Sequence, residues 1–168
     1  MSLVKTYVAG RQTGSIPRIN YSTDLGVTWT PTNFNASASL IQAIAVRQDD
    51  PNFLLVGNTY VNGDTNNQGI QYSTDGGLTW SQSGGTWTGT VTNYSLIGYT
   101  NLMVIDSDPL NTIVYTTATD FGGAVRLLRS DDNGYNFEVV NTSNSIYGSG
   151  NYIIYALAAY DTNLFVAV

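Results

Sequence analysis

The chain repeats one short stretch, Ser22-Thr23-Asp24-Leu25-Gly26-Val27-Thr28-Trp29, as Ser73-Thr74-Asp75-Gly76-Gly77-Leu78-Thr79-Trp80 and, in altered form, as Ser130-Asp131-Asp132-Asn133-Gly134-Tyr135-Asn136-Phe137. The first serines of the copies lie 51 and 57 residues apart. Repetition at such a period is typical of arrays of supersecondary units, such as solenoids and propellers. Each copy follows a run that alternates like a β-strand, so the repeat decides the fold.

Each residue type of the motif has a physical reason in a tight hairpin. An Asp carboxylate accepts hydrogen bonds from backbone N–H groups of the turn, and Gly takes the positive φ that other residues resist. Ser and Thr hydroxyls bind neighbouring backbone groups. The aromatic residue at the start of the outgoing strand is expected to bury a large surface against an adjoining sheet. The residues with these structural roles are Ser22, Asp24, Gly26, Thr28, Trp29, Ser73, Asp75, Gly77, Thr79, Trp80, Ser130, Asp132, Gly134 and Phe137.

Two apolar runs flank an Asp-Pro turn in each interval between the copies. Pro fixes φ and Asp caps the turn, so the runs are predicted to be the first and second strands of a unit. The strands that enter and leave the motif complete a set of four short strands per period. The runs are 41–46 and 53–57 around Asp50-Pro51, and 102–105 and 113–115 around Asp108-Pro109.

The repeated stretch resembles the Asp-box, also called the bacterial neuraminidase repeat, of sialidases, xyloglucan-active glycoside hydrolases, sortilin-type receptors and photosystem II assembly factors. Two copies match the pattern at all five key positions, and their units span nearly the whole chain. The resemblance implies a β-propeller with the box at the hairpin between the third and fourth strands of a blade, away from the ligand-binding face. Asn136 and Phe137 depart from the pattern, so the third hairpin is expected to persist with altered packing.

We therefore predict an all-β fold, an incomplete β-propeller-like array of four-stranded antiparallel blades that forms one module over residues 1–168. Two units are complete and two are partial. A propeller closes with about 4–8 blades. The chain is thus expected to be a piece of a longer polypeptide or to assemble so that partial blades complete one another, with unpaired terminal strands as sites of self-association. The units span 4–33, 41–83, 101–141 and 152–168.

Composition narrows the function classes. Charged residues make up 11% of the chain, the net charge is −6, and there is neither Cys nor His. Six basic residues give no basic patch, so nucleic-acid binding is not expected. There is no apolar run long enough to span a membrane and no signal peptide is visible. The uncharged, Asn-, Thr- and Tyr-rich composition is typical of virion structural proteins and of extracellular or cell-surface proteins, and the lack of Cys is also compatible with the cytoplasm.

No catalytic residue, metal ligand or cofactor is predicted. The absence of His excludes Ser-His-Asp and Cys-His catalysis. We interpret Arg18 and Glu138 as surface strand residues rather than as parts of a sialidase site. Asp64, Asp106 and Asp120 have no turn to form, so a two-carboxylate glycosidase site among them remains an alternative.

The range 83–99 is the best candidate for a binding site. It contains Trp87, Tyr94 and Tyr99 among Gly, Ser and Thr residues, and it is longer than a hairpin loop requires. Aromatic faces stack on sugars and anchor protein interfaces; the alternative is that these side chains pack inward or between subunits. The sequence thus favours a non-catalytic binding or structural module that contacts proteins or glycans. Its alternatives are a fragment of a sialidase-like or xyloglucanase-like hydrolase and an intracellular assembly factor.

Overall fold

The structure of the chain, a computed structural model, describes ten ranges of residues. In these ranges every regular element is a β-strand. The prediction of an all-β fold is therefore confirmed. None of the described segments forms a helix long and apolar enough to cross a membrane. The described ranges are 5–10, 17–35, 41–47, 50–58, 69–85, 103–105, 113–119, 125–140, 156–160 and 163–167.

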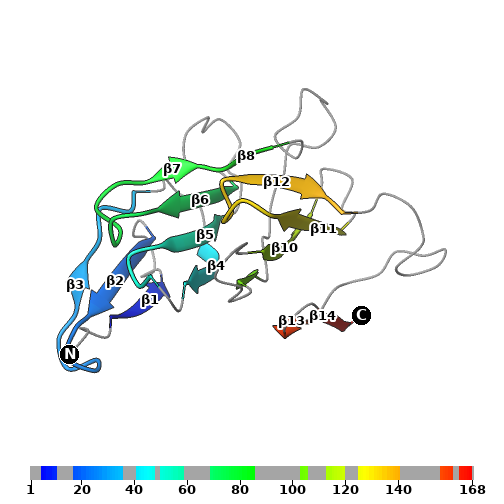
Figure 1. Cartoon of the computed structure of the whole chain (residues 1–168). Helices are drawn as coiled ribbons and strands as arrows, with labels where there is room; N and C mark the ends of the chain where they lie inside the picture. Colours follow the sequence, from blue (N-terminus) through cyan, green and yellow to red (C-terminus); the bar gives the residue numbers. More distant parts are fainter. Residues whose placement is uncertain are drawn as a thin grey trace.

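The strands form four small sheets, and over the described residues none of them is closed (Figure 1). Within a sheet, strands that follow one another in the chain pair antiparallel. The first sheet contains β1 (Thr6–Gly10), β2 (Arg18–Ser22) and β3 (Thr30–Pro31). The second contains β4 (Ile41–Val46), β5 (Leu54–Asn58), β6 (Ile70–Ser73) and β7 (Ser81–Gln82). The third contains β9 (Met103–Ile105), β10 (Val114–Thr119), β11 (Val125–Ser130) and β12 (Asn136–Val139), and the fourth contains β13 (Ala156–Tyr160) and β14 (Asn163–Ala167).

A further short strand, β8 (Gly84–Gly85), joins two units of the sequence. It follows β7 of the second sheet in the chain but pairs parallel with β12 of the third, with Gly84 opposite Asn136 and Gly85 opposite Phe137. Parallel strands need a long connection, and here it runs from the end of one repeat to the end of the next. The predicted loop 83–99 thus begins with a strand of the following sheet.

Apolar side chains fill the space between successive sheets. Neighbouring residues of β5 point to opposite faces of the second sheet. Val56 packs with Ile19 of the first sheet, whereas Leu55 packs with Leu128 and Phe137 of the third. All residues of β5 are buried, because the second sheet is covered on both faces.

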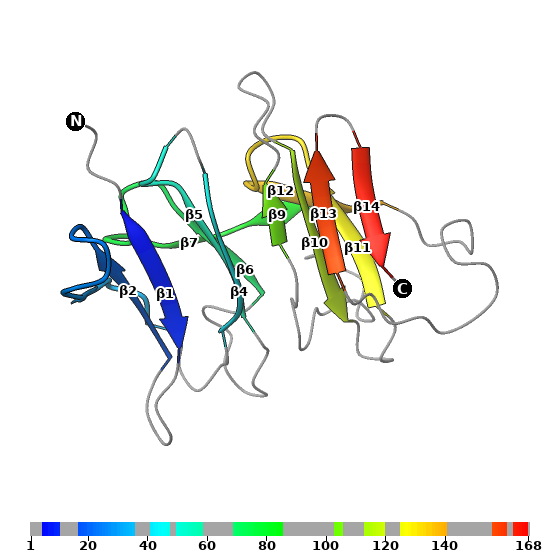
Figure 2. The same cartoon turned by 90° about the horizontal axis from the view of Figure 1, so that it is seen from below.

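Successive sheets also meet along one side of the row. Strand β4 lies against β1 and against β9, and β13 lies against β9. Figure 2 shows the first three sheets from below, where they stand beside one another in the order of the chain, and the fourth sheet overlaps the third in this view. The three repeated turns lie elsewhere, at the hairpins from β2 to β3, from β6 to β7 and from β11 to β12.

Candidate functional site

The first repeated turn is closed by the side chains of Ser22, Asp24 and Thr28. Ser22 Oγ accepts hydrogen bonds from the N–H groups of Gly26 at 2.8 Å and Asp24 at 3.2 Å, and it donates to Asp24 Oδ1 at 2.6 Å. The Thr28 N–H donates to Asp24 Oδ1 at 2.8 Å, and its hydroxyl donates to Oδ2 at 2.5 Å. Both carboxylate oxygens are therefore engaged inside the turn.

The second turn repeats this network. Ser73 Oγ accepts from the Gly77 N–H at 2.8 Å and donates to Asp75 Oδ1 at 2.8 Å. Thr79 donates to the Asp75 carboxylate through its N–H at 2.9 Å and through its hydroxyl at 2.6 Å. The identical residues at the same spacing thus form the same turn.

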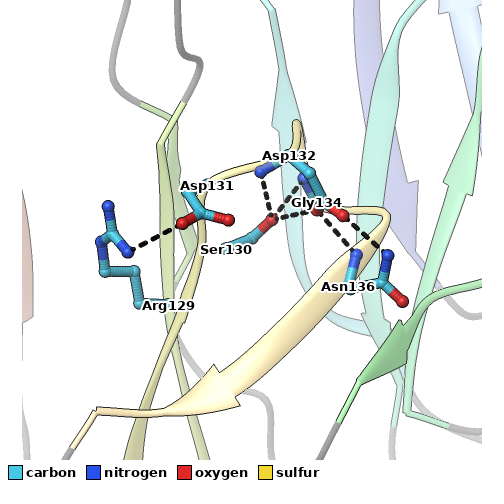
Figure 3. A network of polar contacts seen from close by, with 6 residues as sticks. All are labelled: Arg129, Ser130, Asp131, Asp132, Gly134 and Asn136. Carbon is cyan, nitrogen blue, oxygen red and sulfur yellow. Dashed lines mark hydrogen bonds and ion pairs between the residues drawn. The ribbon is translucent and has the colours of Figure 1, made fainter.

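The third turn keeps the network although one residue type differs (Figure 3). Ser130 Oγ accepts from the Gly134 N–H at 2.8 Å and donates to Asp132 Oδ1 at 2.7 Å. Asn136 stands where the other copies have Thr, and its Nδ2 donates to Asp132 Oδ2 at 2.7 Å. An amide N–H takes the place of the Thr hydroxyl, so the third hairpin persists as expected.

The backbone of the turns explains the glycine. The φ angles are +89° at Gly26, +91° at Gly77 and +84° at Gly134. The residue before the glycine is left-handed as well, with φ of +59° at Leu25 and +65° at Asn133. A side chain costs about 1–2 kcal/mol in this region, so two successive left-handed residues favour a glycine at one of them.

The carboxyl groups of the turns have lowered pKa values. Hydrogen bonds from Ser22 and then from Thr28 lower the pKa of Asp24 to about 2. The hydrogen bonds from Thr79 are the largest cause that lowers the pKa of Asp75 to about 2. Burial acts to raise the pKa of Asp132, but the hydrogen bonds of its turn outweigh burial, and its pKa is lowered. A general acid needs a pKa near the working pH. These carboxylates are ionised acceptors and are unsuited to donate a proton at neutral pH.

The segment that leaves the first turn binds the second turn. The Asn33 N–H donates to the Gly77 carbonyl oxygen at 2.9 Å, and Asn33 Nδ2 donates to the Leu78 carbonyl oxygen at 3.1 Å. Thr32 lies so close to Gly77 that a Cβ on this glycine would be 2.6 Å from Thr32 Cγ2. The glycine is thus required by a contact between sheets as well as by φ.

The segment that leaves the second turn binds the third in a similar way. Ser83 Oγ donates to the Gly134 carbonyl oxygen at 2.6 Å, and the Gly84 N–H donates to the Tyr135 carbonyl oxygen at 2.7 Å. Ser83 and Thr32 are not among the predicted site residues, although each stands three places after the Trp of its turn. This shared offset is the sequence signal by which the contact between turns could be found.

The aromatic residue at the end of each turn has a different environment in each copy. Trp29 is 43% exposed, whereas Phe137 is fully buried. Trp80 lies between these extremes: its ring meets Phe34 edge-on with centroids 4.9 Å apart. Phe137 is buried against the second sheet, whereas the burial expected for the Trp of the motif is wrong for Trp29. The aromatic side chain faces the sheet that comes earlier in the chain, and no described residue provides such a sheet for Trp29.

The other predicted residues do not gather into a site within the described ranges. Arg18 and Glu138 are exposed on strands, in agreement with their interpretation as surface residues. The described residues contain no cluster of three or more His, Cys, Asp or Glu side chains that could hold a metal ion. The candidates for ligand binding and for a carboxylate pair lie outside the described residues: these are Trp87, Tyr94, Tyr99, Asp64, Asp106 and Asp120.

Comparison with protein-family models finds no match to the chain, and comparison with curated proteins finds none either. The resemblance to Asp-box repeats therefore depends on the repeated residues alone. The three hydrogen-bonded turns give those residues a common structural role.

Proposed function

We propose that this chain is an Asp-box, propeller-like module that acts by binding or as a structural component and not by catalysis. The observation that carries the proposal is the use of the repeated carboxylates. Each is held as an ionised acceptor inside its own turn, by the Ser two places before it and by the residue four places after it. The most regular acidic groups of the chain thus stabilise hairpins, which leaves them no role in proton transfer.

The arrangement of the sheets supports a propeller-like assembly. Apart from β8, strands pair in chain order within a sheet, and the first three sheets pack face to face with apolar side chains between them. Propeller blades have four such strands and follow one another around an axis. In such an assembly the rigid sheets would hold the connecting loops in place, and partners would contact those loops.

The partner is proposed to be a protein or a glycan on a virion or cell exterior. The aromatic range 83–99 supplies Trp87, Tyr94 and Tyr99 for such contacts, because aromatic rings stack on sugars and fill pockets at protein interfaces. Low charge and many uncharged polar side chains suit an exterior surface that contacts other molecules without strong electrostatic attraction.

The test combines a glycan array with a panel of fluorogenic glycosides. We expect no turnover of any glycoside, and we expect bound glycans to be lost in Trp87→Ala but kept in Leu78→Ala, an exposed apolar control. Hydrolysis of a sialoside or a xyloglucan oligosaccharide that disappears in Asp106→Asn would contradict the proposal and favour the hydrolase. Copurification with particles or with a membrane complex would separate the virion component from the assembly factor.

A further inference from the structure

We propose that the open face of the first sheet binds the fourth sheet of a second copy of this chain. The open face is the side of that sheet turned away from the second sheet, and Val8, Asn20 and Trp29 mark it. The inference rests on the proposed structural function and goes beyond it by naming an interface and its occupant.

The registers of the sheets show which positions are equivalent. Val8 pairs with Asn20 in the first sheet, and Val56 pairs with Gln71 in the second. Asn20 and Gln71 both stand two places before the serine of their turn, so Val8 and Val56 occupy the same place. Val56 is fully buried against the first sheet, whereas Val8 is 45% exposed. The same valine position is thus a core residue in one sheet and a surface residue in the other.

The third sheet gives the same result at the positions equivalent to Val8, Asn20 and Trp29. Thr116 pairs with Leu128, two places before the serine of the third turn, and both are fully buried. Phe137, the equivalent of Trp29, is fully buried among residues of the second sheet that include Leu55. In the second and third sheets the earlier sheet covers this face. In the first sheet the face is exposed, and it carries the apolar Val8 and Trp29 beside the polar Asn20 and the charged Arg18.

Backbone acceptors point to the same conclusion. In the second turn the carbonyl oxygen of Gly77 accepts a hydrogen bond from the Asn33 N–H, and that of Leu78 accepts one from Asn33 Nδ2. The equivalent carbonyls in the first turn belong to Gly26 and Val27, and no donor from the described part of the chain reaches them. The first turn thus offers the acceptors that bind a neighbouring sheet in the rest of the row.

The occupant follows from the direction of the row. The fourth sheet packs on the third through β13 and β9. Ala158 of β13 is exposed while the adjacent Leu157 is partly buried, and neighbouring residues of a strand point to opposite faces, so Ala158 marks an open side of the fourth sheet. The second and third sheets each receive the earlier sheet on the same face, so we expect the open side of the fourth sheet to meet the equivalent face of the first. A second copy would continue the row in the same sense, a heterologous contact that closes a ring or extends a filament.

The first test is the mass of the particle in solution as a function of concentration. We expect association, and we expect Val8→Lys and Trp29→Ala to raise the dissociation constant by roughly tenfold or more, since each removes apolar area from the interface. The control Leu78→Lys changes a side chain that is 61% exposed at the tip of the second turn, and it should associate like the wild type. A wild type that is monomeric at every concentration, or equal weakening by the control, would overturn the proposal.

Crosslinking identifies the occupant. The chain has no Cys, so Val8→Cys and Ala158→Cys introduce the only thiols. A short bifunctional thiol reagent should join the double variant into dimers and larger species, and it should leave the pair Leu78→Cys with Ala158→Cys unjoined. Dimers from Val8→Cys alone would show that two first sheets face each other, and a link within one longer natural polypeptide would assign the face to an earlier sheet of that polypeptide. Either result would overturn the proposal.

The outcome is separable from that of the proposed function. An unassociated chain without glycosidase activity would refute the interface alone, and an associated chain with glycosidase activity would refute the non-catalytic function alone.

Discussion

The first and third turns of this chain have the same internal structure and opposite surroundings. In both, a Ser hydroxyl and an Asp carboxylate bind the backbone of the hairpin with nearly equal distances. Yet the aromatic residue that ends the first turn is 43% exposed, and the one that ends the third is fully buried. Eight residues are thus enough to determine the turn, whereas a neighbouring sheet determines what the turn contributes to the core.

The largest difference between the first and third turns is expected in the free energy of unfolding that is lost when the aromatic side chain is removed. Phe137→Ala should lower the free energy of unfolding by about 3–5 kcal/mol because it empties a buried position. Trp29→Ala, at a partly exposed position, should lower it by no more than about 1 kcal/mol. Urea unfolding of dilute protein, followed by circular dichroism, measures both values. Equal losses would show that Trp29 is covered even in the dilute chain.

The glycines of the same two turns should also differ in their tolerance of a side chain. Gly134→Ala combines a positive φ, at about 1–2 kcal/mol, with overpacking, at about 1–3 kcal/mol, because its Cβ would lie 2.8 Å from the δ-carbons of Leu55. Gly26→Ala has the φ penalty but only an ordinary contact, 3.5 Å from Trp29. In thermal unfolding, the Tm of Gly134→Ala should therefore be lower than the Tm of Gly26→Ala. The reverse order would argue against the contact between the second sheet and the third turn.

Acid should weaken the turns, because the pKa of each of their carboxyl groups is lowered in the folded chain. The pKa values of Asp24 and Asp75 fall from an ordinary value of 3.8 to about 2 in the folded chain. A lowered pKa means that the stabilisation is present above the unfolded value and is lost as the pH falls from 3.8 towards 2. Asp24→Asn and Asp75→Asn should each flatten this acid dependence by a similar amount. The check is the midpoint of urea unfolding measured across that pH range, and a flattening confined to one variant would mean that the turns are not equivalent.

The smallest effect is expected at Asn136, where the third turn departs from the repeat. Asn136→Thr should change the free energy of unfolding by less than about 0.5 kcal/mol, since a Thr hydroxyl binds the same carboxylate oxygen in the other turns. Asn136→Ala removes the donor and should cost about 1 kcal/mol. If Thr proves as costly as Ala, the amide has a role beyond the turn.

Local structure could be predicted from the sequence because its interactions are local. The strands 41–46 and 70–72 and the three hairpins follow from alternation, from the Asp-Pro turn and from residues four places apart. The exposure of Trp29 could not be predicted in this way. It depends on whether an earlier sheet packs against the first sheet, and the eight residues of the turn carry no signal of that. The same holds for Gly84, whose pairing with Asn136 joins residues of different repeats.

The order of strands within the sheets also bears on how the chain folds. Apart from β8 and β12, strands that pair within a sheet follow one another in sequence, so they close short loops, and such contacts form quickly. The bonds between turns span far more chain: the one from Ser83 to Gly134 joins residues 51 places apart. Individual sheets should therefore form as separate cooperative units before they dock. In native-state hydrogen exchange, the amide of Gly84 should then open before the amides of β5, whose sheet is covered on both sides.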